Sequence, residues 1–337
     1  IDYTNGEPSI LLEPSRTNLI TFSNDFTNAA WTKTNATITA NQAISPEGIQ
    51  NADKYSGTTI GQNFFHTISV SDNFSYSVYV KYINAPFIRL RVNSISTWFN
   101  IETIEVATNG FADASIEDVG NGWRKLTVIN TTAGSFTTAY IHPHATDNTT
   151  LEQDGGEFFF YGAQLEAGSY ATSLIHTSGS AVTRSADSVR NAGNSDLISN
   201  SEGVLYAELA RTSDNATYEL IAISSGVANY QNIVALGFDA NNNEIWYRAQ
   251  VDTKDLILAV GAEVRPQNEF FKIAIKYKSG DSKVYLNGKM IDSTTTTGST
   301  SVAFTTLDLA FFNIYNFYGK LKNVTVFKEA LTDLELE

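Results

Sequence analysis

The stretch Ile273–Asp292, with the sequence IAIKYKSGDSKVYLNGKMID, decides the fold class. Apolar residues recur at every second position from Phe271 to Tyr277, and this period of two is the pattern of a half-buried β-strand. Further along, Asn287-Gly288 separates Lys283–Leu286 from Lys289–Asp292. Asn-Gly is the strongest short-range signal for a β-hairpin, because both residues tolerate the positive φ of a tight turn. The stretch therefore predicts antiparallel strands joined by tight turns.

The same alternation runs through nearly the whole chain. It is clear in Phe74–Lys81, Phe87–Val92 and Lys125–Ile129, where β-branched and aromatic residues dominate. Helical periodicity is confined to the short segment Ala330–Glu335. Many short strands without βαβ alternation indicate antiparallel sandwiches. We therefore predict an all-β protein made of two antiparallel β-sandwiches (jelly rolls) in tandem.

A change in composition marks the boundary between the two. From His176 to Gly203 the chain is rich in Ser, Asn, Gly and Asp and poor in bulky apolar residues. We place the division near Ala186, which gives domains of residues 1–185 and 186–337. Both lengths are normal for a β-sandwich.

Composition excludes several classes of function. The 337 residues contain 22 Lys and Arg against 36 Asp and Glu, a net charge of −14, which is unsuited to binding the phosphate backbone of a nucleic acid. The absence of cysteine excludes disulfides and thiolate metal sites. No apolar stretch reaches the ~18 residues of a membrane span, so we expect no membrane insertion. Because the chain begins at Ile1 rather than Met, we expect a processed part of a longer protein.

Several segments resemble known families. In the first half these are Asp2–Ile20 (DYTNGEPSILLEPSRTNLI), Tyr76–Lys81 (YSVYVK) and Gly162–Gly168 (GAQLEAG). They resemble a domain of phage tail and fibre proteins whose fold is similar to jelly-roll carbohydrate-binding modules. In the second half, Glu202–Ala210 (EGVLYAELA) and Gly319–Glu337 (GKLKNVTVFKEALTDLELE) resemble a concanavalin A-like or laminin G-like sandwich. The resemblance implies a virion-surface or extracellular setting more than it implies a ligand.

Strand alternation also predicts which side chains point away from the core. Aromatic rings can stack on sugar rings, and guanidinium groups can grip carboxylates through two parallel hydrogen bonds. If their strands share one sheet, an outer face of rings and planar donors results, which suits a cell-surface polysaccharide and in particular an acidic one. The predicted ligand-binding residues are Tyr79, Arg89, Arg91, Trp98, Tyr140 and His142.

The same face could instead pack against another subunit, since an exposed apolar patch marks either role. The sequence therefore leaves two hypotheses. One is a non-catalytic glycan-binding or adhesion module of a tail fibre, capsid decoration or extracellular protein. The other is a purely structural decoration protein of a virion or filament, with this face buried between subunits. In either case we expect a homo-oligomer and contacts with other virion or fibre subunits.

The second half offers further rings for a site, although core packing accounts for most of them. Alternation points Tyr285 outward, and Tyr315 and Tyr318 fall in a predicted loop tip. Trp246 and Tyr247 complete the set.

A third hypothesis is an enzyme that degrades polysaccharides. Glu152, Asp154 and Glu157 fit the pattern E-x-D-x-x-E, which resembles the paired carboxylates of concanavalin A-like β-glucanases. Here Gly155-Gly156 interrupts the strand that such a pattern requires. We therefore interpret the motif as a solvated turn and expect no enzymatic activity.

Two metal sites are considered. His142-Pro143-His144 places two imidazoles on one face of a strand, although Pro143 favours a strand end with ordinary histidines. A structural calcium ion near Glu13 and Glu166 is the other, with Asn18 and Asp25 in the same segments. Oxygen ligands suit this hard cation, but Glu13 could equally pair with Arg16. We expect no other cofactor.

Overall fold

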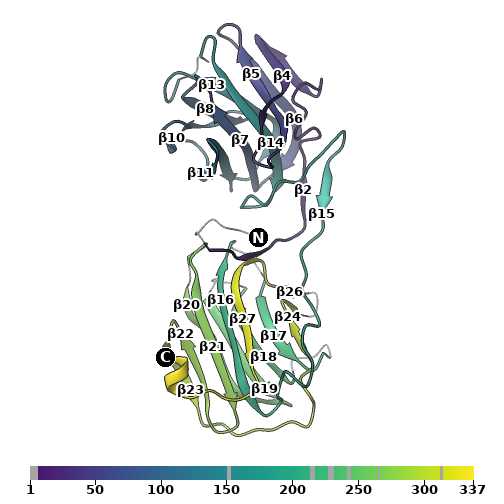
Figure 1. The fold of residues 1–337 in the computed structure, drawn as a ribbon, viewed down its shortest axis with the longest axis vertical. Coiled ribbons are helices and arrows are strands. Elements are labelled where there is room, and N and C mark those ends of the chain that lie inside the picture. The colour runs from purple at the N-terminus through teal and green to yellow at the C-terminus, as the bar shows by residue number, and fades with distance from the viewer. Residues whose placement is uncertain are drawn as a thin grey trace. The chain divides into compact units, whose positions relative to one another are not determined.

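The computed structural model describes residues 7–149, 153–212, 217–226, 231–240, 244–264, 266–311 and 314–337. In this part of the chain nearly all regular structure is β, with one four-residue helix, α1 (Asp333–Leu336). The chain divides into two compact units, which we call the N-terminal sandwich (Ser15–Ser185) and the C-terminal sandwich (Ile1–Pro14 with Ala186–Glu337) (Figure 1). The prediction of two antiparallel β-sandwiches is confirmed. Among the described residues, no helix has the length and apolar content that a membrane span needs.

The N-terminal sandwich contains two six-stranded antiparallel sheets. Sheet 1 has the order β10 (Glu105–Asn109), β9 (Ile95–Asn100), β8 (Phe87–Val92), β13 (Ser135–His144), β6 (Asn63–Ser71) and β3 (Trp31–Thr34). Sheet 2 has the order β11 (Asp113–Gly120), β12 (Trp123–Asn130), β7 (Phe74–Tyr82), β14 (Glu157–Ala167), β5 (Gln50–Gly57) and β4 (Ala36–Ile44). A separate pair joins β2 (Arg16–Asn18) to β15 (Val182–Arg184).

Alternate residues of the two sheets form the core of this sandwich. Val78 and Val80 point inward from sheet 2, and Leu90 points inward from sheet 1. Part of the core is an aromatic cluster, in which the rings of Trp31 and Phe64 stack with centroids 4.9 Å apart. Burial of these apolar surfaces supplies the main driving force for folding, and it fixes which residues of each strand face away from the core.

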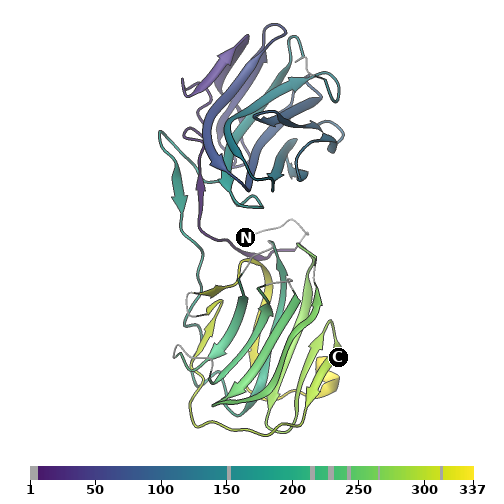
Figure 2. The ribbon, with the colours of Figure 1, turned by 180° about the vertical axis from the view of Figure 1, so that it is seen from behind.

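The C-terminal sandwich also has two sheets, shown from both sides in Figures 1 and 2. Sheet 3 has the order β1 (Ile10–Leu12), β27 (Gly319–Phe327), β16 (Glu202–Arg211), β21 (Phe271–Lys278), β22 (Ser282–Leu286) and β23 (Lys289–Thr294). Sheet 4 has the order β20 (Lys254–Val264), β19 (Glu244–Val251), β18 (Ile233–Phe238), β17 (Glu219–Ser224), β26 (Tyr315–Asn316) and β25 (Ala310–Phe311), and β24 (Thr306–Asp308) also pairs with β17. The pairing of β17 with β26 is parallel.

Strand β1, before Pro14, belongs to the C-terminal sandwich, whereas the expected division at residue 185 places it in the N-terminal one. Strand β1 pairs with β27, with Leu11 opposite Lys320, and the backbone N–H of Glu13 donates to the Asp187 carboxylate at 2.9 Å. Edge pairing therefore assigns this segment to the C-terminal sandwich. The chain enters the N-terminal sandwich at Ser15 and returns to the C-terminal sandwich at Ala186.

The Asn287-Gly288 turn forms as the sequence predicts. Leu286 of β22 lies opposite Lys289 of β23, and the φ angles of Asn287 and Gly288 are 49° and 77°. Positive φ at both central residues is the geometry of a type I′ hairpin, whose twist matches that of the flanking strands. Helix α1 lies close to the predicted helical segment and starts after Thr332 as its N-cap.

Candidate functional site

Most of the predicted face lies on the outer side of sheet 1. Ile88, Leu90 and Val92 of β8 point into the core, so Arg89 and Arg91 point the other way. The register then brings further predicted residues beside them. Arg89 lies opposite Trp98 of β9 and His142 of β13, and Arg91 lies opposite Tyr140 of β13. Five of the six predicted ligand-binding residues therefore share one face.

These side chains contact one another in pairs. The guanidinium carbon of Arg91 lies 4.7 Å from the centroid of the Tyr140 ring, and that of Arg89 lies 5.6 Å from the centroid of the Trp98 ring. Both distances are within the ~6 Å of a cation–π contact. Nη2 of Arg89 also lies 2.7 Å from Nδ1 of His142. The two guanidinium groups are thus held in place by aromatic neighbours.

A groove of about 550 Å³ runs over this face. Its lining combines the two guanidinium groups and one indole ring with an isoleucine and several small residues, namely Arg89, Arg91, Ser94, Ile95, Ser96, Trp98, Thr108 and Gly110. A Cβ atom at Gly110 would lie only 2.6 Å from the carbonyl oxygen of Ser96. The backbone at this wall can approach β9 so closely only because residue 110 has no side chain.

The charge state of the groove follows from its contacts. Burial and the neighbouring guanidinium of Arg89 lower the pKa of His142 well below its ordinary value. The ring is therefore neutral at pH 7. Arg89 can only donate, so it points an N–H at Nδ1 of His142, and the backbone N–H of Phe64 points at Nε2 at 3.3 Å. The positive charge of the groove consequently comes from Arg89 and Arg91.

The expected exposure of this face is wrong in part. Trp98 is 8% exposed, Arg89 5% and His142 1%, whereas Arg91 and Tyr140 are half-buried. The residues that follow β13 contact sheet 1 beside these side chains. Asp147 accepts hydrogen bonds from Thr108 of β10, and Oγ1 of Thr149 lies 3.0 Å from Nδ1 of His144. Arg91 and Tyr140 are thus the more accessible of the five predicted residues on this face.

Tyr79 lies on the other sheet, so its inclusion in this face is wrong. Its strand β7 pairs with β12 and β14, which places it in sheet 2. Alternation does point Tyr79 away from the core, but there it packs against Tyr161, with ring centroids 6.3 Å apart. The buried Trp123 belongs to the same apolar cluster.

Phe65 is a member of the sheet 1 face that sequence reasoning missed. It lies opposite Tyr140 in the register, and the two ring centroids are 4.9 Å apart. The alternation of β6, in which Phe64, His66 and Ile68 are buried, could have revealed it. The groove residues Thr108 and Gly110 have no comparable signal, because Thr108 lies where the register of β10 shifts and Gly110 follows that strand.

The two adjacent histidines do lie on one face, close to the end of β13. Nδ1 of His142 is occupied by Arg89, and Nδ1 of His144 lies beside Thr149. A guanidinium group next to an imidazole opposes the binding of a metal cation there. The interpretation as structural histidines is therefore the better supported one.

The residues named for calcium have partners of their own. The Glu166 carboxylate accepts from the backbone N–H and the hydroxyl of Thr172 at 2.7 and 2.6 Å, and burial raises its pKa. Asn18 accepts from the N–H groups of Ile20 and Leu165. Glu13 belongs to the other sandwich. Within the described residues no group of three His, Cys, Asp or Glu side chains is arranged to hold a metal, and the calcium site stays a prediction.

Two of the three carboxylates of the enzyme hypothesis, Asp154 and Glu157, lie in the described part of the chain. Glu152 lies outside the described residues. Asp154 is exposed in a turn. Glu157 begins β14, forms an ion pair with Lys54 at 2.7 Å and accepts from Ser56 at 2.8 Å. These contacts lower the pKa of Glu157, which is the opposite of what a general acid needs.

The rings of the C-terminal sandwich fall into different environments. Tyr247 is buried in the core. Trp246 packs with Tyr218 and Tyr315 on the outer side of sheet 4, in a small apolar cluster. Tyr285 faces outward from sheet 3 as predicted, yet it is only 2% exposed. Apolar residues of the C-terminal segment, Leu331 and Leu336, pack against the cluster that contains it.

A family model matches most of the C-terminal sandwich. Residues 194–337 match the family model of the concanavalin A-like lectin/glucanases superfamily. This match confirms the expected concanavalin A-like fold of the second half. No sequence among the curated proteins compared with the chain matches it.

Parts of the chain are similar to some solved structures. One is the native heptameric SAP-like pentraxin from Limulus polyphemus, with 16% identity, a TM-score of 0.32, and coverage of 44% of this chain and 72% of the pentraxin. Another is domain 4 of an extracellular arabinanase from Geobacillus stearothermophilus in complex with arabinotriose, with 18% identity, a TM-score of 0.34, and coverage of 50% and 78%. A third is an arabinofuranosidase complexed with arabinofuranosyl-alpha-1,2-xylobiose, with 11% identity, a TM-score of 0.31, and coverage of 79% and 60%.

Proposed function

We propose that the chain is a non-catalytic glycan-binding module of a virion-surface or extracellular protein, such as a tail fibre or capsid decoration. Its ligand is an acidic cell-surface polysaccharide that binds along the groove of sheet 1. The observation that carries this proposal is the pairing of Arg91 with Tyr140 beside the Arg89–Trp98 pair. It combines two cationic side chains with the Trp98 ring in one groove, and Tyr140 lies beside Arg91.

The chemistry of the groove supports an acidic saccharide. A carboxylate on a sugar can accept two parallel hydrogen bonds from one guanidinium group. Because Arg91 is already positioned by Tyr140, little side-chain entropy is lost on binding. The overall charge of −14 works against an acidic ligand at long range, so the local pair of arginines must supply the attraction.

A glycan array tests the proposal directly. The intact chain is applied to acidic and neutral polysaccharides, once with calcium and once with a chelator. We expect binding to uronate- or sialate-containing glycans that weakens as salt is added, because exposed charges are screened. Binding to no glycan under any of these conditions would refute the proposal.

A purely structural role is the second candidate, and the half-buried pair of Phe65 and Tyr140 favours it. In a homo-oligomer, another subunit could cover these rings. Quenching of Trp98 cannot separate the two roles, because Trp98 is already shielded within its own chain. The molar mass measured by light scattering can separate the two roles. A stable oligomer that dissociates on Tyr140→Glu supports the structural role.

The proposal includes the absence of hydrolysis. An assay for new reducing ends, run on any polysaccharide that binds, checks this part. Release of sugar that disappears in Glu157→Gln would instead support the enzyme hypothesis.

A further inference from the structure

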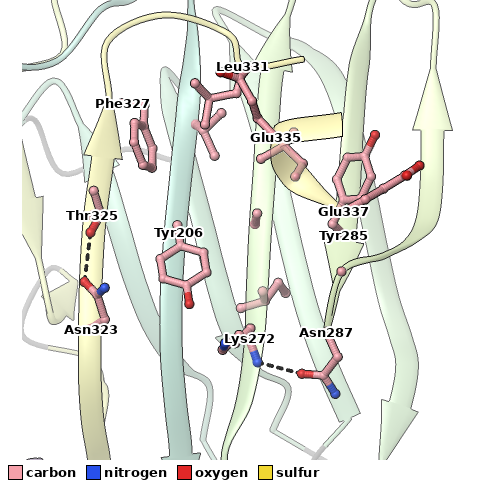
Figure 3. A pocket seen from close by; sticks show the side chains of 15 residues that line it. Tyr206, Lys272, Tyr285, Asn287, Asn323, Thr325, Phe327, Leu331, Glu335 and Glu337 are labelled. Carbon is pink, nitrogen blue, oxygen red and sulfur yellow. Dashed lines mark hydrogen bonds between the residues drawn. The ribbon is translucent and has the colours of Figure 1, made fainter. Parts of the chain in front are cut away.

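A second hollow lies in the C-terminal sandwich, on the outer side of sheet 3. It has a volume of about 390 Å³, which is within the range of about 300–1,000 Å³ typical of small-molecule sites. Figure 3 shows Tyr206 on its floor, Phe327 at one side and Tyr285 at the other. Strands β16, β21 and β27 form the floor, and the segment from Leu331 to Glu337 borders it.

The hollow exists because a small residue separates two large ones. In the register of sheet 3, Thr325, Tyr206, Ala274 and Tyr285 are successive neighbours across four strands. All four point away from the core, since the residues that flank Ala274 along its strand, Ile273 and Ile275, belong to the core. Ala274 is too short to fill the space between the two tyrosine rings, and Leu331 and Leu336 of the C-terminal segment pack there, so Ala274 is only 5% exposed.

The C-terminal segment is fastened beside the hollow. Nζ of Lys283 lies 2.6 Å from one carboxylate oxygen of Asp333, and Nζ of Lys276 lies 3.7 Å from the other. At the start of α1, Thr332 and Glu335 form a reciprocal capping box. These contacts give the hollow a fixed border, which reduces the ordering that a ligand would require.

Two side-chain amides at the edge are already oriented. Oδ1 of Asn323 accepts the hydroxyl proton of Thr325 at 2.8 Å, and Oδ1 of Asn287 accepts the backbone N–H of Lys272 at 2.8 Å. Both bonds are drawn in Figure 3. With each oxygen held, each NH₂ group becomes a fixed donor at the edge of the hollow. Neither NH₂ group donates to another of the described residues, and both asparagines are exposed.

We propose that this hollow binds one neutral saccharide ring, independently of the groove on sheet 1. The exposed faces of Tyr206 and Phe327 suit the apolar side of a sugar, and the amides of Asn323 and Asn287 suit its hydroxyl groups. Charges at the edge are mixed, since Lys272 is accompanied by Glu335 and Glu337. Because these charges balance, we expect the hollow not to favour an anion, whereas the two guanidinium groups of the groove do favour one.

The test uses the intact chain and a panel of methyl glycosides of glucose, galactose, N-acetylglucosamine and arabinose. Binding is followed by ¹⁵N chemical-shift titration. We expect saturable binding of at least one glycoside, with shifts at Ala274 and Asn323. Asn323→Ala should weaken that binding about 3- to 10-fold through the loss of one hydrogen bond.

Ala274→Leu provides a second variant that fills the hollow. It should abolish binding while the sandwich remains folded. Ser293→Ala, at an exposed position of the neighbouring strand β23, is the matched control and should bind as the wild type does.

The outcomes separate this site from the groove. Arg91→Ala should leave the binding of the neutral glycoside unchanged, even if the groove binds no glycan at all. If no glycoside binds saturably, the inference is wrong. It is also wrong if Arg91→Ala removes the binding while Ala274→Leu and Asn323→Ala do not.

Discussion

The guanidinium group of Arg91 lies over the ring of Tyr140, with 4.7 Å between its carbon and the ring centroid. The two residues are direct cross-strand neighbours on β8 and β13, so the sheet itself sets their distance. Cross-strand pairs of this kind stabilise a sheet by fractions of a kcal/mol. Their greater effect here is to hold a cationic fork at the accessible part of the groove.

Arg91→Ala should therefore reduce the affinity for an acidic polysaccharide about 10- to 100-fold, because a charge-assisted hydrogen bond is lost. Arg91→Lys should give an intermediate loss, since it keeps the charge but not the planar fork. Titration calorimetry measures both, and thermal unfolding checks that the fold is intact. Lys125→Ala, on the outer face of sheet 2, is the matched control. An equal loss in the Lys125 variant would show that general charge, not the groove, binds the ligand.

How far the sequence predicts this face can be stated residue by residue. Period-two alternation placed Arg89, Arg91 and Tyr140 on the outer side of their strands, because burial of every second residue is a local property of a strand. Alternation could not tell which strands share a sheet. The sequence therefore groups Tyr79 with residues of the opposite sheet. Its true sheet is set by the pairing of β7 with β12 and β14.

The exposure of outward-pointing side chains is the other property that strand alternation does not predict. Trp98 and Tyr285 both point away from a core, and both are covered by other parts of the chain. Such coverage depends on the path of connections after β13 and after β27. No periodic signal encodes these paths, because loops follow turn chemistry and side-chain bonds such as that between Thr108 and Asp147.

The buried carboxyl of Asp53 should make the N-terminal sandwich less stable as the pH rises. Burial raises the pKa of Asp53 to about 6, against the opposing effect of the N–H groups of Asn41 and Phe26. The unfolded chain titrates near the ordinary value of about 3.9. Between these values the folded state holds a proton that the unfolded state has lost, so the free energy of unfolding should fall, by at most about 3 kcal/mol, from pH 4 to pH 6.

Urea unfolding from pH 4 to pH 6.5 measures this slope. Unfolding is followed by tryptophan fluorescence in a Trp246→Phe background, in which all remaining tryptophans lie in the N-terminal sandwich. The slope should be smaller in Asp53→Asn, which removes the titrating group, and unchanged in Asp72→Asn, which removes an exposed carboxylate. Identical profiles for the wild type and Asp53→Asn would contradict the assignment.

The ammonium group of Lys33 should stabilise the loop that precedes β3. Its Nζ donates to the carbonyl oxygens of Thr27, Asn28 and Trp31 at 3.0, 2.7 and 2.9 Å. Burial lowers the pKa of Lys33, but these bonds favour the charged form. Lys33→Met keeps the apolar stem and leaves three carbonyl groups without this donor. We expect a loss of about 1–3 kcal/mol in the free energy of unfolding.

Urea unfolding of Lys33→Met and Lys125→Met provides the comparison. Lys125→Met should change the stability by no more than about 0.5 kcal/mol, as is usual for surface substitutions. Equal effects of the two variants would show that the three carbonyl contacts do not matter.

Gly288 should tolerate alanine less well than Gly280 does. Both glycines have positive φ, at 77° and 80°, so each Gly→Ala change costs about 1–2 kcal/mol through the left-handed conformation alone. The difference lies in their surroundings. A Cβ atom at Gly288 would lie 2.3 Å from the backbone oxygen of Glu337, whereas one at Gly280 would meet Thr297 at an ordinary 3.6 Å. Gly288→Ala must therefore also displace the segment that carries α1. Urea unfolding should show the larger loss for Gly288→Ala, and hydrogen exchange should show faster exchange at Glu335 and Glu337 in that variant only. Equal losses, with unchanged exchange at both sites, would mean that the C-terminal segment does not pack on the hairpin in solution.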